Sequence, residues 1–130
     1  MNPVRRLSFL LFIALLSACN TACITGGSRK VGAAVCEKGH ASFYSHHMNG
    51  CKTASGERYH ADAYTAAHRK LPFGTKVRVK NLKNGQEITL RINDRGPYLK
   101  GRVIDVSEAA ARKLGMTRSG VVPVELVVIR

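Results

Sequence analysis

The chain has 130 residues, of which 21 are Lys or Arg and 8 are Asp or Glu, so its formal net charge is +13. With 45% hydrophobic residues it should fold as one domain rather than stay disordered, and no apolar stretch is long enough for a permanent membrane-spanning helix. The excess of positive charge indicates an anionic partner: nucleic acid, anionic lipid or an acidic polysaccharide.

Residues 1–18 have the composition of a bacterial export signal. A basic pair, Arg5 and Arg6, is followed by apolar residues 7–16 and then by small residues before Cys19. The four residues that end at this cysteine read Leu-Ser-Ala-Cys and resemble the lipobox of bacterial lipoproteins, where cleavage exposes a cysteine that is acylated. The alternative is an ordinary secretory signal with an incidental cysteine.

A lipobox implies that Cys19 anchors the mature chain to a membrane through acyl chains. Because Asn20 is not the aspartate of an inner-membrane retention signal, we expect the periplasmic face of the outer membrane. Export excludes nucleic acid as a partner. Cleavage removes two of the 21 basic residues, which leaves 19 against 8 acidic ones and a charge of +11. Peptidoglycan is the abundant anionic polymer in that compartment.

Small polar residues follow, so residues 19–36 are predicted to form a lipidated flexible tether, with the folded domain over residues 37–130. Three further cysteines occur, and one disulfide is expected in an oxidising compartment. We favour Cys36 with Cys51, since they flank the first predicted strand, and Cys23 would be free or would pair between molecules. No C-x-x-C or H-x-x-x-H spacing supports a metal site, so we expect neither metal nor cofactor.

Strand patterns dominate the domain. Apolar residues alternate with polar ones, and Asn84-Gly85 is a strong tight-turn dipeptide between two such runs. The predicted strands cover residues 41–45, 75–80, about 88–92, 102–106 and 121–129. One helix is predicted after Ser107, an N-cap, with Gly115 as its end. Periodicity alone leaves a compact β-barrel and a small α+β sandwich equally possible.

Three clusters combine reactive side chains with turn-forming neighbours: residues 53–57, residues 65–74 and residues 93–97. Glu57 lies beside a glycine that can adopt positive φ, and Asp94 follows a hairpin strand where the chain turns sharply. Each also has a plain structural interpretation. Asp94 could cap a turn, Glu57 could be a solvated loop charge, and His68 could be a satisfied, half-buried histidine.

Taken in order, these motifs resemble the rare lipoprotein A family over residues 39–129. The matching runs are Gly39-His40-Ala41-Ser42-Phe43-Tyr44, Thr53-Ala54-Ser55-Gly56-Glu57, Thr65-Ala66-Ala67-His68, Leu71-Pro72-Phe73-Gly74-Thr75, Val77-Arg78-Val79, Asn81-Leu82, Ile92-Asn93-Asp94-Arg95-Gly96-Pro97, Gly101-Arg102, Ile104-Asp105, Ser107, Ala109-Ala110-Ala111 and Leu114-Gly115-Met116. The resemblance implies a mainly β fold, a six-stranded double-psi β-barrel with one or two short helices. It also implies an endolytic peptidoglycan lytic transglycosylase that prefers glycan strands without stem peptides and leaves 1,6-anhydro ends.

The resemblance also implies roles for individual residues. Asp94 corresponds to the catalytic acid, and Glu57 and His68 to the other two active-site residues. Tyr44, Asn93 and Arg95 are the expected substrate-binding residues; stacking on a sugar suits Tyr44, and binding of a lactyl carboxylate suits Arg95. A monomer is expected.

Two other functions compete with the enzyme. The first is a non-catalytic module that binds or loosens peptidoglycan, because similar barrels in expansin-like proteins bind glycan without cleaving it. The second is a structural lipoprotein that ties the outer membrane to the wall by charge. Only the enzyme needs Glu57, His68 and Asp94 together.

Overall fold

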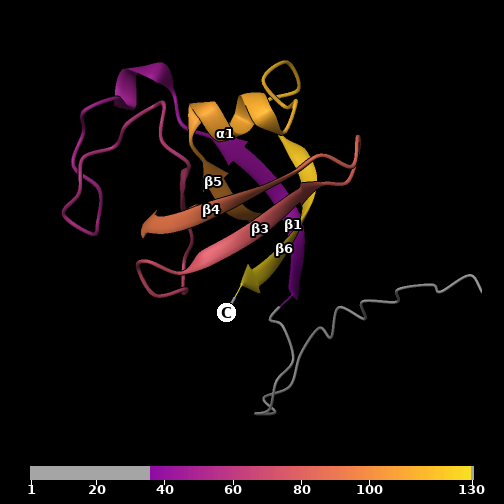
Figure 1. Cartoon of the computed structure of the whole chain (residues 1–130), viewed down its shortest axis with the longest axis horizontal. Helices are drawn as coiled ribbons and strands as arrows, with labels where there is room; N and C mark the ends of the chain where they lie inside the picture. Colours follow the sequence, from indigo (N-terminus) through magenta and orange to yellow (C-terminus); the bar gives the residue numbers. More distant parts are fainter. Residues whose placement is uncertain (1–35, 130) are drawn as a thin grey trace, which may run out of the picture.

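The computed structural model describes residues 36–129, and it shows a barrel of six strands with one short α-helix (Figure 1). The elements, in chain order, are β1 (Cys36–Phe43), the 3₁₀ helix η1 (His46–Met48), β2 (Thr65–Ala67), β3 (Lys76–Asn81), β4 (Glu87–Asp94), β5 (Arg102–Val106), α1 (Glu108–Lys113) and β6 (Val122–Ile129). Within these residues, no helix is long and apolar enough to cross a membrane.

The six strands close on themselves in the order β1-β5-β2-β4-β3-β6. The pairs β1–β5 and β2–β4 are parallel, and the other four pairs are antiparallel. Parallel neighbours need crossover connections, so strands far apart in the sequence become adjacent. Closure confirms the barrel and excludes the α+β sandwich.

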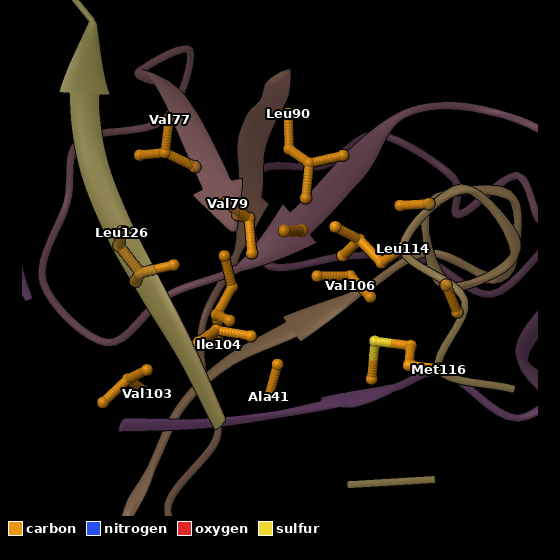
Figure 2. Close-up of a cluster of buried hydrophobic side chains, with 14 of the residues drawn as sticks. Ala41, Val77, Val79, Leu90, Val103, Ile104, Val106, Leu114, Met116 and Leu126 are labelled. Atoms are coloured by element: carbon orange, nitrogen blue, oxygen red, sulfur yellow. The ribbon is translucent and has the colours of Figure 1, made fainter. Parts of the chain in front are cut away.

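The barrel interior is filled by the residues of each strand that face inward, which alternate along the strand with residues that face outward. In β3 the even alternation of exposed and buried residues places Val77 and Val79 inside, and in β4 Leu90 and Ile92 face them. Figure 2 shows Val77, Val79 and Leu90 converging with side chains of β5, β6 and the segment after α1. The largest fully buried apolar residues include Ile104, Leu114 and Met116.

Helix α1 begins and ends as predicted. The Ser107 side chain accepts a hydrogen bond from the Ala110 N–H at 3.3 Å, which satisfies one of the free donors of the first turn. At the other end, the side chains of Asn81, the last residue of β3, and Asn84, in the turn between β3 and β4, donate to the Leu114 carbonyl at 2.8 and 2.9 Å. The helix is therefore fixed to the barrel at its carboxyl end.

Five of the six strands overlap predicted ones, and β5 has the predicted bounds. β2 was not predicted. Its three residues, Thr65–Ala67, are all buried, so the segment has no alternation that could reveal it. The start of β1 also lies outside the prediction, because Glu37 and Lys38 interrupt the apolar pattern.

The predicted Cys36–Cys51 disulfide is wrong. Cys36 is disulfide-bonded, but Cys51 has a free and exposed thiol. The strand between them explains this. Residues 36–43 are extended, so at about 3.3 Å per residue the two ends of β1 lie roughly 23 Å apart, and Cys51 belongs to the loop that follows the far end. A disulfide requires Cα atoms within about 7 Å. Cys19 and Cys23, with the predicted signal and most of the tether, lie outside the described residues.

Candidate active site

Asp94, the last residue of β4, is held by three hydrogen bonds. Its Oδ1 accepts from the backbone N–H groups of Ala54 and Arg95 at 2.8 and 2.9 Å, and its Oδ2 accepts from the Tyr44 hydroxyl at 2.7 Å. Figure 1 shows the long loop between β1 and β2 beside the end of β4. Two segments that are about 40 residues apart in the sequence therefore fix one half-buried carboxylate.

Tyr44 is a permanent hydrogen-bond donor to this carboxylate. Burial raises the pKa of its phenol above the usual range, and the hydrogen bond to Asp94 and the charges of Asp94 and Asp105 raise it further. Its ring lies against that of Tyr59, with centroids 4.5 Å apart and planes tilted by 46°. Tyr59 is 1% exposed, and its hydroxyl accepts from the Glu108 N–H at 3.1 Å. Tyr59 therefore connects the ring of Tyr44 to the first residue of α1, Glu108.

Glu57 belongs to the loop that supplies the Ala54 N–H. Its carboxylate accepts from both Arg91 amino groups, at 2.8 and 2.9 Å, and from the Asn93 side chain at 3.3 Å. These two sets of hydrogen bonds, Arg91 first, lower the pKa of the Glu57 carboxyl. Glu57 is exposed, and Asn93 is only 2% exposed, so in this structure the Asn93 amide positions Glu57.

The turn that precedes Glu57 requires a glycine at position 56. Gly56 has φ 91°, a conformation that other residues rarely adopt, which confirms the predicted positive φ. Thr53 closes the turn, because its N–H and its hydroxyl both donate to the Glu57 carbonyl, at 2.7 and 2.8 Å. The same turn carries Ala54 and Ser55, whose N–H groups donate to Asp94 and to the Asn93 carbonyl.

His68 is buried directly behind Asp94 and has a defined tautomer. Its Nδ1 accepts from the backbone N–H groups of Lys70 and Leu71, both at 3.1 Å, so its proton lies on Nε2. Nε2 donates to Glu37 of β1 at 2.8 Å. The His68 N–H also donates to the Asp94 carbonyl at 3.2 Å. His68 therefore shapes the chain around Asp94 rather than contacting its carboxylate.

Arg95 holds the loop that follows His68. Its Nη1 donates to the Leu71 and His68 carbonyls at 2.8 and 3.3 Å, and its guanidinium lies 4.0 Å from the centroid of the Phe73 ring. Part of the Arg95 guanidinium is therefore used to hold the backbone of the loop that follows His68. Binding of a substrate carboxylate by Arg95 stays a prediction.

Replacing His68 by alanine should destabilise the protein by about 1–3 kcal/mol. The change removes the acceptor of two backbone N–H groups and deletes a side chain that is only 6% exposed. Urea unfolding followed by circular dichroism measures the effect. His60→Ala, at an exposed position, is the control. A loss for His68→Ala no larger than that of the control would contradict the assigned role.

The structure brings Tyr44, Asp94 and the Glu57 loop together, with His68, Asn93 and Arg95 as their supports. Three contributors were not predicted: Glu37, Tyr59 and the pair Ser42–Asp105, whose side chains are hydrogen-bonded. Within residues 36–129 no group of three His, Cys, Asp or Glu side chains could hold a metal ion.

Fold and site together define a double-psi β-barrel with a carboxylate held at a strand end. Residues 36–126 match the model of the lytic transglycolase family, and the chain belongs to that family.

Curated relatives of high identity support this assignment. The chain is 55% identical over 93 residues to the probable endolytic peptidoglycan transglycosylase RlpA of Aquifex aeolicus (strain VF5), covering 72% of this chain and 41% of that protein. It is also 55% identical over 91 residues to the endolytic peptidoglycan transglycosylase RlpA of Pasteurella multocida (strain Pm70), covering 68% of this chain and 31% of that protein. The chain thus spans less than half the length of both relatives.

Two solved structures share the fold at lower identity. The Streptomyces papain inhibitor has a TM-score of 0.59 at 25% identity, covering 73% of this chain and 94% of that chain. The apo form of Clavibacter michiganensis expansin has a TM-score of 0.58 at 25% identity, covering 73% of this chain and 50% of that chain. Proteins with different names therefore share this barrel, so the function has to be argued from the site.

Proposed function

We propose that this protein is an endolytic peptidoglycan lytic transglycosylase that cleaves the bond between N-acetylmuramic acid and N-acetylglucosamine. The observation that carries the proposal is the half-buried Asp94 carboxylate, fixed by Ala54, Arg95 and Tyr44. A positioned carboxyl group is what glycosidic cleavage requires as a proton donor. The names of the curated relatives agree with this activity.

Asp94 acts first as an acid. Its carboxyl proton passes to the glycosidic oxygen, the bond from that oxygen to C1 breaks, and C1 gains oxocarbenium character. The 6-hydroxyl of the same muramic acid residue then bonds to C1 and gives its proton to the Asp94 carboxylate, so the product has a 1,6-anhydro ring and no water is consumed. The Tyr44 hydroxyl stabilises the Asp94 carboxylate between the two steps, because it keeps its proton and donates to Oδ2.

The substrate we propose is glycan without stem peptides. Asp94 is only half-buried, and two exposed aromatic side chains belong to its surroundings. The ring of Phe73, which is 43% exposed, lies against Arg95, and Tyr98, which is 77% exposed, directly follows Pro97. Such rings suit stacking on bare sugar rings. The net charge of +13 for the whole chain adds a non-specific attraction to the anionic wall.

We further propose that acylation of Cys19 anchors the protein, as a monomer, to the periplasmic face of the outer membrane. The lipobox-like sequence that ends at Cys19 supports this. Labelling of cells with a fatty-acid analogue tests it. The label should be present in wild type and absent in Cys19→Ala, and persistent labelling of the variant would refute the anchor.

The activity is tested with purified protein on two substrates: peptidoglycan treated with an amidase, and the same material with its stem peptides intact. Mass spectrometry of the products should show new anhydro ends, with more from the treated material. New reducing ends instead of anhydro ends would indicate a hydrolase. Equal rates on both substrates would refute the preference for glycan without stem peptides.

A non-catalytic glycan-binding protein is the second candidate, favoured by the similarity of the barrel to that of expansin. This candidate predicts that the protein sediments with insoluble glycan but produces no new ends of either kind. The product analysis therefore separates the two functions.

Glu57→Gln should lower the rate of cleavage by about 10- to 100-fold, with little change in stability. The exposed pair with Arg91 contributes at most about 1 kcal/mol to folding, but it fixes the loop whose Ala54 N–H holds Asp94. Glu87→Gln is a matched control, because Glu87 pairs with Arg78 on exposed surface at the far end of β4. Equal rates for the two variants would contradict a role for Glu57.

A further inference from the structure

The arginine side chains around the candidate active site differ in how far their guanidinium groups are already used. Both amino groups of Arg91 donate to the Glu57 carboxylate. Arg95, which the sequence suggested for binding a lactyl carboxylate, donates through Nη1 to the carbonyls of His68 and Leu71. A substrate carboxylate would therefore compete with contacts inside the protein at either residue.

Arg102, the first residue of β5, differs from both. Its side chain is half-buried, and within residues 36–129 it makes one hydrogen bond, from Nη1 to the Ser42 hydroxyl oxygen at 3.5 Å, and no ion pair. A guanidinium carries five N–H donors in a planar fork. Most of the donors of Arg102 are therefore available to a ligand.

The contact with Ser42 places the Arg102 guanidinium on the outside of the barrel. On β1 the side chain of Ala41 is fully buried in the core, so the side chain of the next residue, Ser42, faces outward. The Ser42 hydroxyl in turn donates to Asp105, a half-buried residue that lies between two core residues of β5. The guanidinium thus lies beside the outer face of β1 and β5.

The same outer surface leads to Asp94. Asp105 is in register with Ala67 of β2, and Ala67 with Asp94 of β4. Adjacent strands lie about 4.8 Å apart, so β5 and β4 are roughly 10 Å from each other at this level. Tyr44 spans the interval, because its hydroxyl donates to Asp94 and the nearby Asp105 charge contributes to the raised pKa of its phenol. A single glycan strand can therefore contact both Asp94 and Arg102.

The carboxylates of this surface make a cation necessary for any anionic ligand. Asp94 and Asp105 both lie there, and their charges repel a third negative group at such distances. Arg91 is already neutralised by Glu57, whereas Arg102 supplies positive charge on the β5 side. An anionic group of a substrate should therefore bind next to Arg102.

Muramic acid carries such a group close to its sugar ring only when the stem peptide is absent. The peptide is joined through an amide to the lactyl carboxyl group, and its removal by an amidase leaves a free carboxylate. A guanidinium binds a carboxylate through two parallel, charge-assisted hydrogen bonds, which a neutral amide cannot match.

We propose that Arg102 binds the free lactyl carboxylate of N-acetylmuramic acid and thereby selects glycan strands without stem peptides. The inference rests on the proposed function for the nature of the substrate, peptidoglycan glycan, and it gives Arg102 no part in the cleavage itself. It also supplies a physical cause for the proposed substrate preference, since the stem peptide removes the charge that Arg102 recognises.

Isothermal titration calorimetry tests the proposal, with Asp94→Asn as the parent protein so that the probes stay intact. Three probes of equal length are compared: amidase-treated glycan cut into short soluble fragments, the same fragments with their carboxyl groups converted to methylamides, and chitin oligosaccharides, which have no lactyl groups. Adding Arg102→Gln should weaken binding of the first probe by about 10- to 100-fold, the usual contribution of hydrogen bonds to a charged group, and change binding of the other two by less than about twofold.

Arg118→Gln in the same parent is the matched control. It removes the same charge from an exposed residue between α1 and β6, and it should leave the affinity for every probe nearly unchanged. Equal losses for Arg118→Gln and Arg102→Gln would mean that net charge alone attracts the glycan, and the inference would be overturned.

The two proposals fail in different ways. If wild type forms no anhydro ends, but Arg102→Gln loses affinity only for the carboxylate-bearing fragments, the proposed cleavage fails and the carboxylate site is supported. If wild type is active, but Arg102→Gln binds these fragments as the parent does or loses affinity equally for all three probes, only the carboxylate site is overturned. A parent protein that binds none of the probes overturns it as well.

Arginine modification decides the case if Arg102→Gln does not fold. The parent protein is treated with phenylglyoxal, alone and with saturating amounts of each kind of fragment, and the modified arginines are located by mass spectrometry. Arg102 should react in the free protein and should be protected severalfold more by the carboxylate-bearing fragments than by the methylamides. Protection by the carboxylate-bearing fragments that is no greater than that by the methylamides would refute the proposal.

Discussion

Asp94→Asn is expected to reduce the formation of anhydro ends by a factor of about 10³ or more. An amide cannot give a proton to the glycosidic oxygen, and loss of a general acid typically costs 10²- to 10⁴-fold. The fold should persist, because the asparagine oxygen can still accept from the Ala54 and Arg95 N–H groups. The expected phenotype is therefore a folded protein that binds glycan without cutting it.

Product analysis by mass spectrometry gives the rate, and sedimentation with insoluble glycan gives the binding. Asp62→Asn is the matched control, since its side chain is 96% exposed and lies on another part of the surface. Cleavage by Asp94→Asn at more than a tenth of the wild-type rate would show that another group protonates the leaving oxygen.

Ile104→Ala should destabilise the barrel by about 2–5 kcal/mol. Ile104 is fully buried on β5 and faces residues from several other strands in the closed interior (Figure 2). Truncation removes three buried carbon atoms and leaves a cavity that the closed sheet cannot easily collapse around. For a domain of this size, the loss corresponds to a fall in Tm of roughly 10–30 °C.

Thermal unfolding followed by circular dichroism measures this loss. Ile129→Ala provides the same chemical change at the end of β6, where the side chain is 38% exposed, and it should cost less than about 1 kcal/mol. Equal losses for both variants would mean that Ile104 is not part of a tightly packed core.

The sequence predicts the strands whose two faces differ. Val77 and Val79 in β3, or Leu90 and Ile92 in β4, alternate with polar residues because one face packs inside and the other meets water. β2 could not be predicted in this way, because all three of its residues, Thr65–Ala67, are buried and its two faces do not differ. Nor can periodicity reveal that β2 lies between β4 and β5, because that order is decided by closure of the whole barrel.

The residues of the candidate site could be proposed from the sequence, but their arrangement could not. The family resemblance pointed to Asp94, Glu57 and His68. It could not show that Glu57 is neutralised by Arg91 or that His68 faces Glu37, because these contacts join strands and loops distant in the sequence. Local spacing carries no information on such pairs.

Closure of the sheet also bears on how the chain avoids self-association. Strand β6, with the sequence VPVELVVI, combines the apolar and β-branched residues that favour intermolecular pairing. In the barrel it is hydrogen-bonded to β1 on one side and to β3 on the other, so its backbone groups are occupied. A β-rich protein of this composition thus presents no open sheet edge among its six strands. Aggregation through β6 would require the barrel to open first, which couples resistance to aggregation directly to the stability of the core.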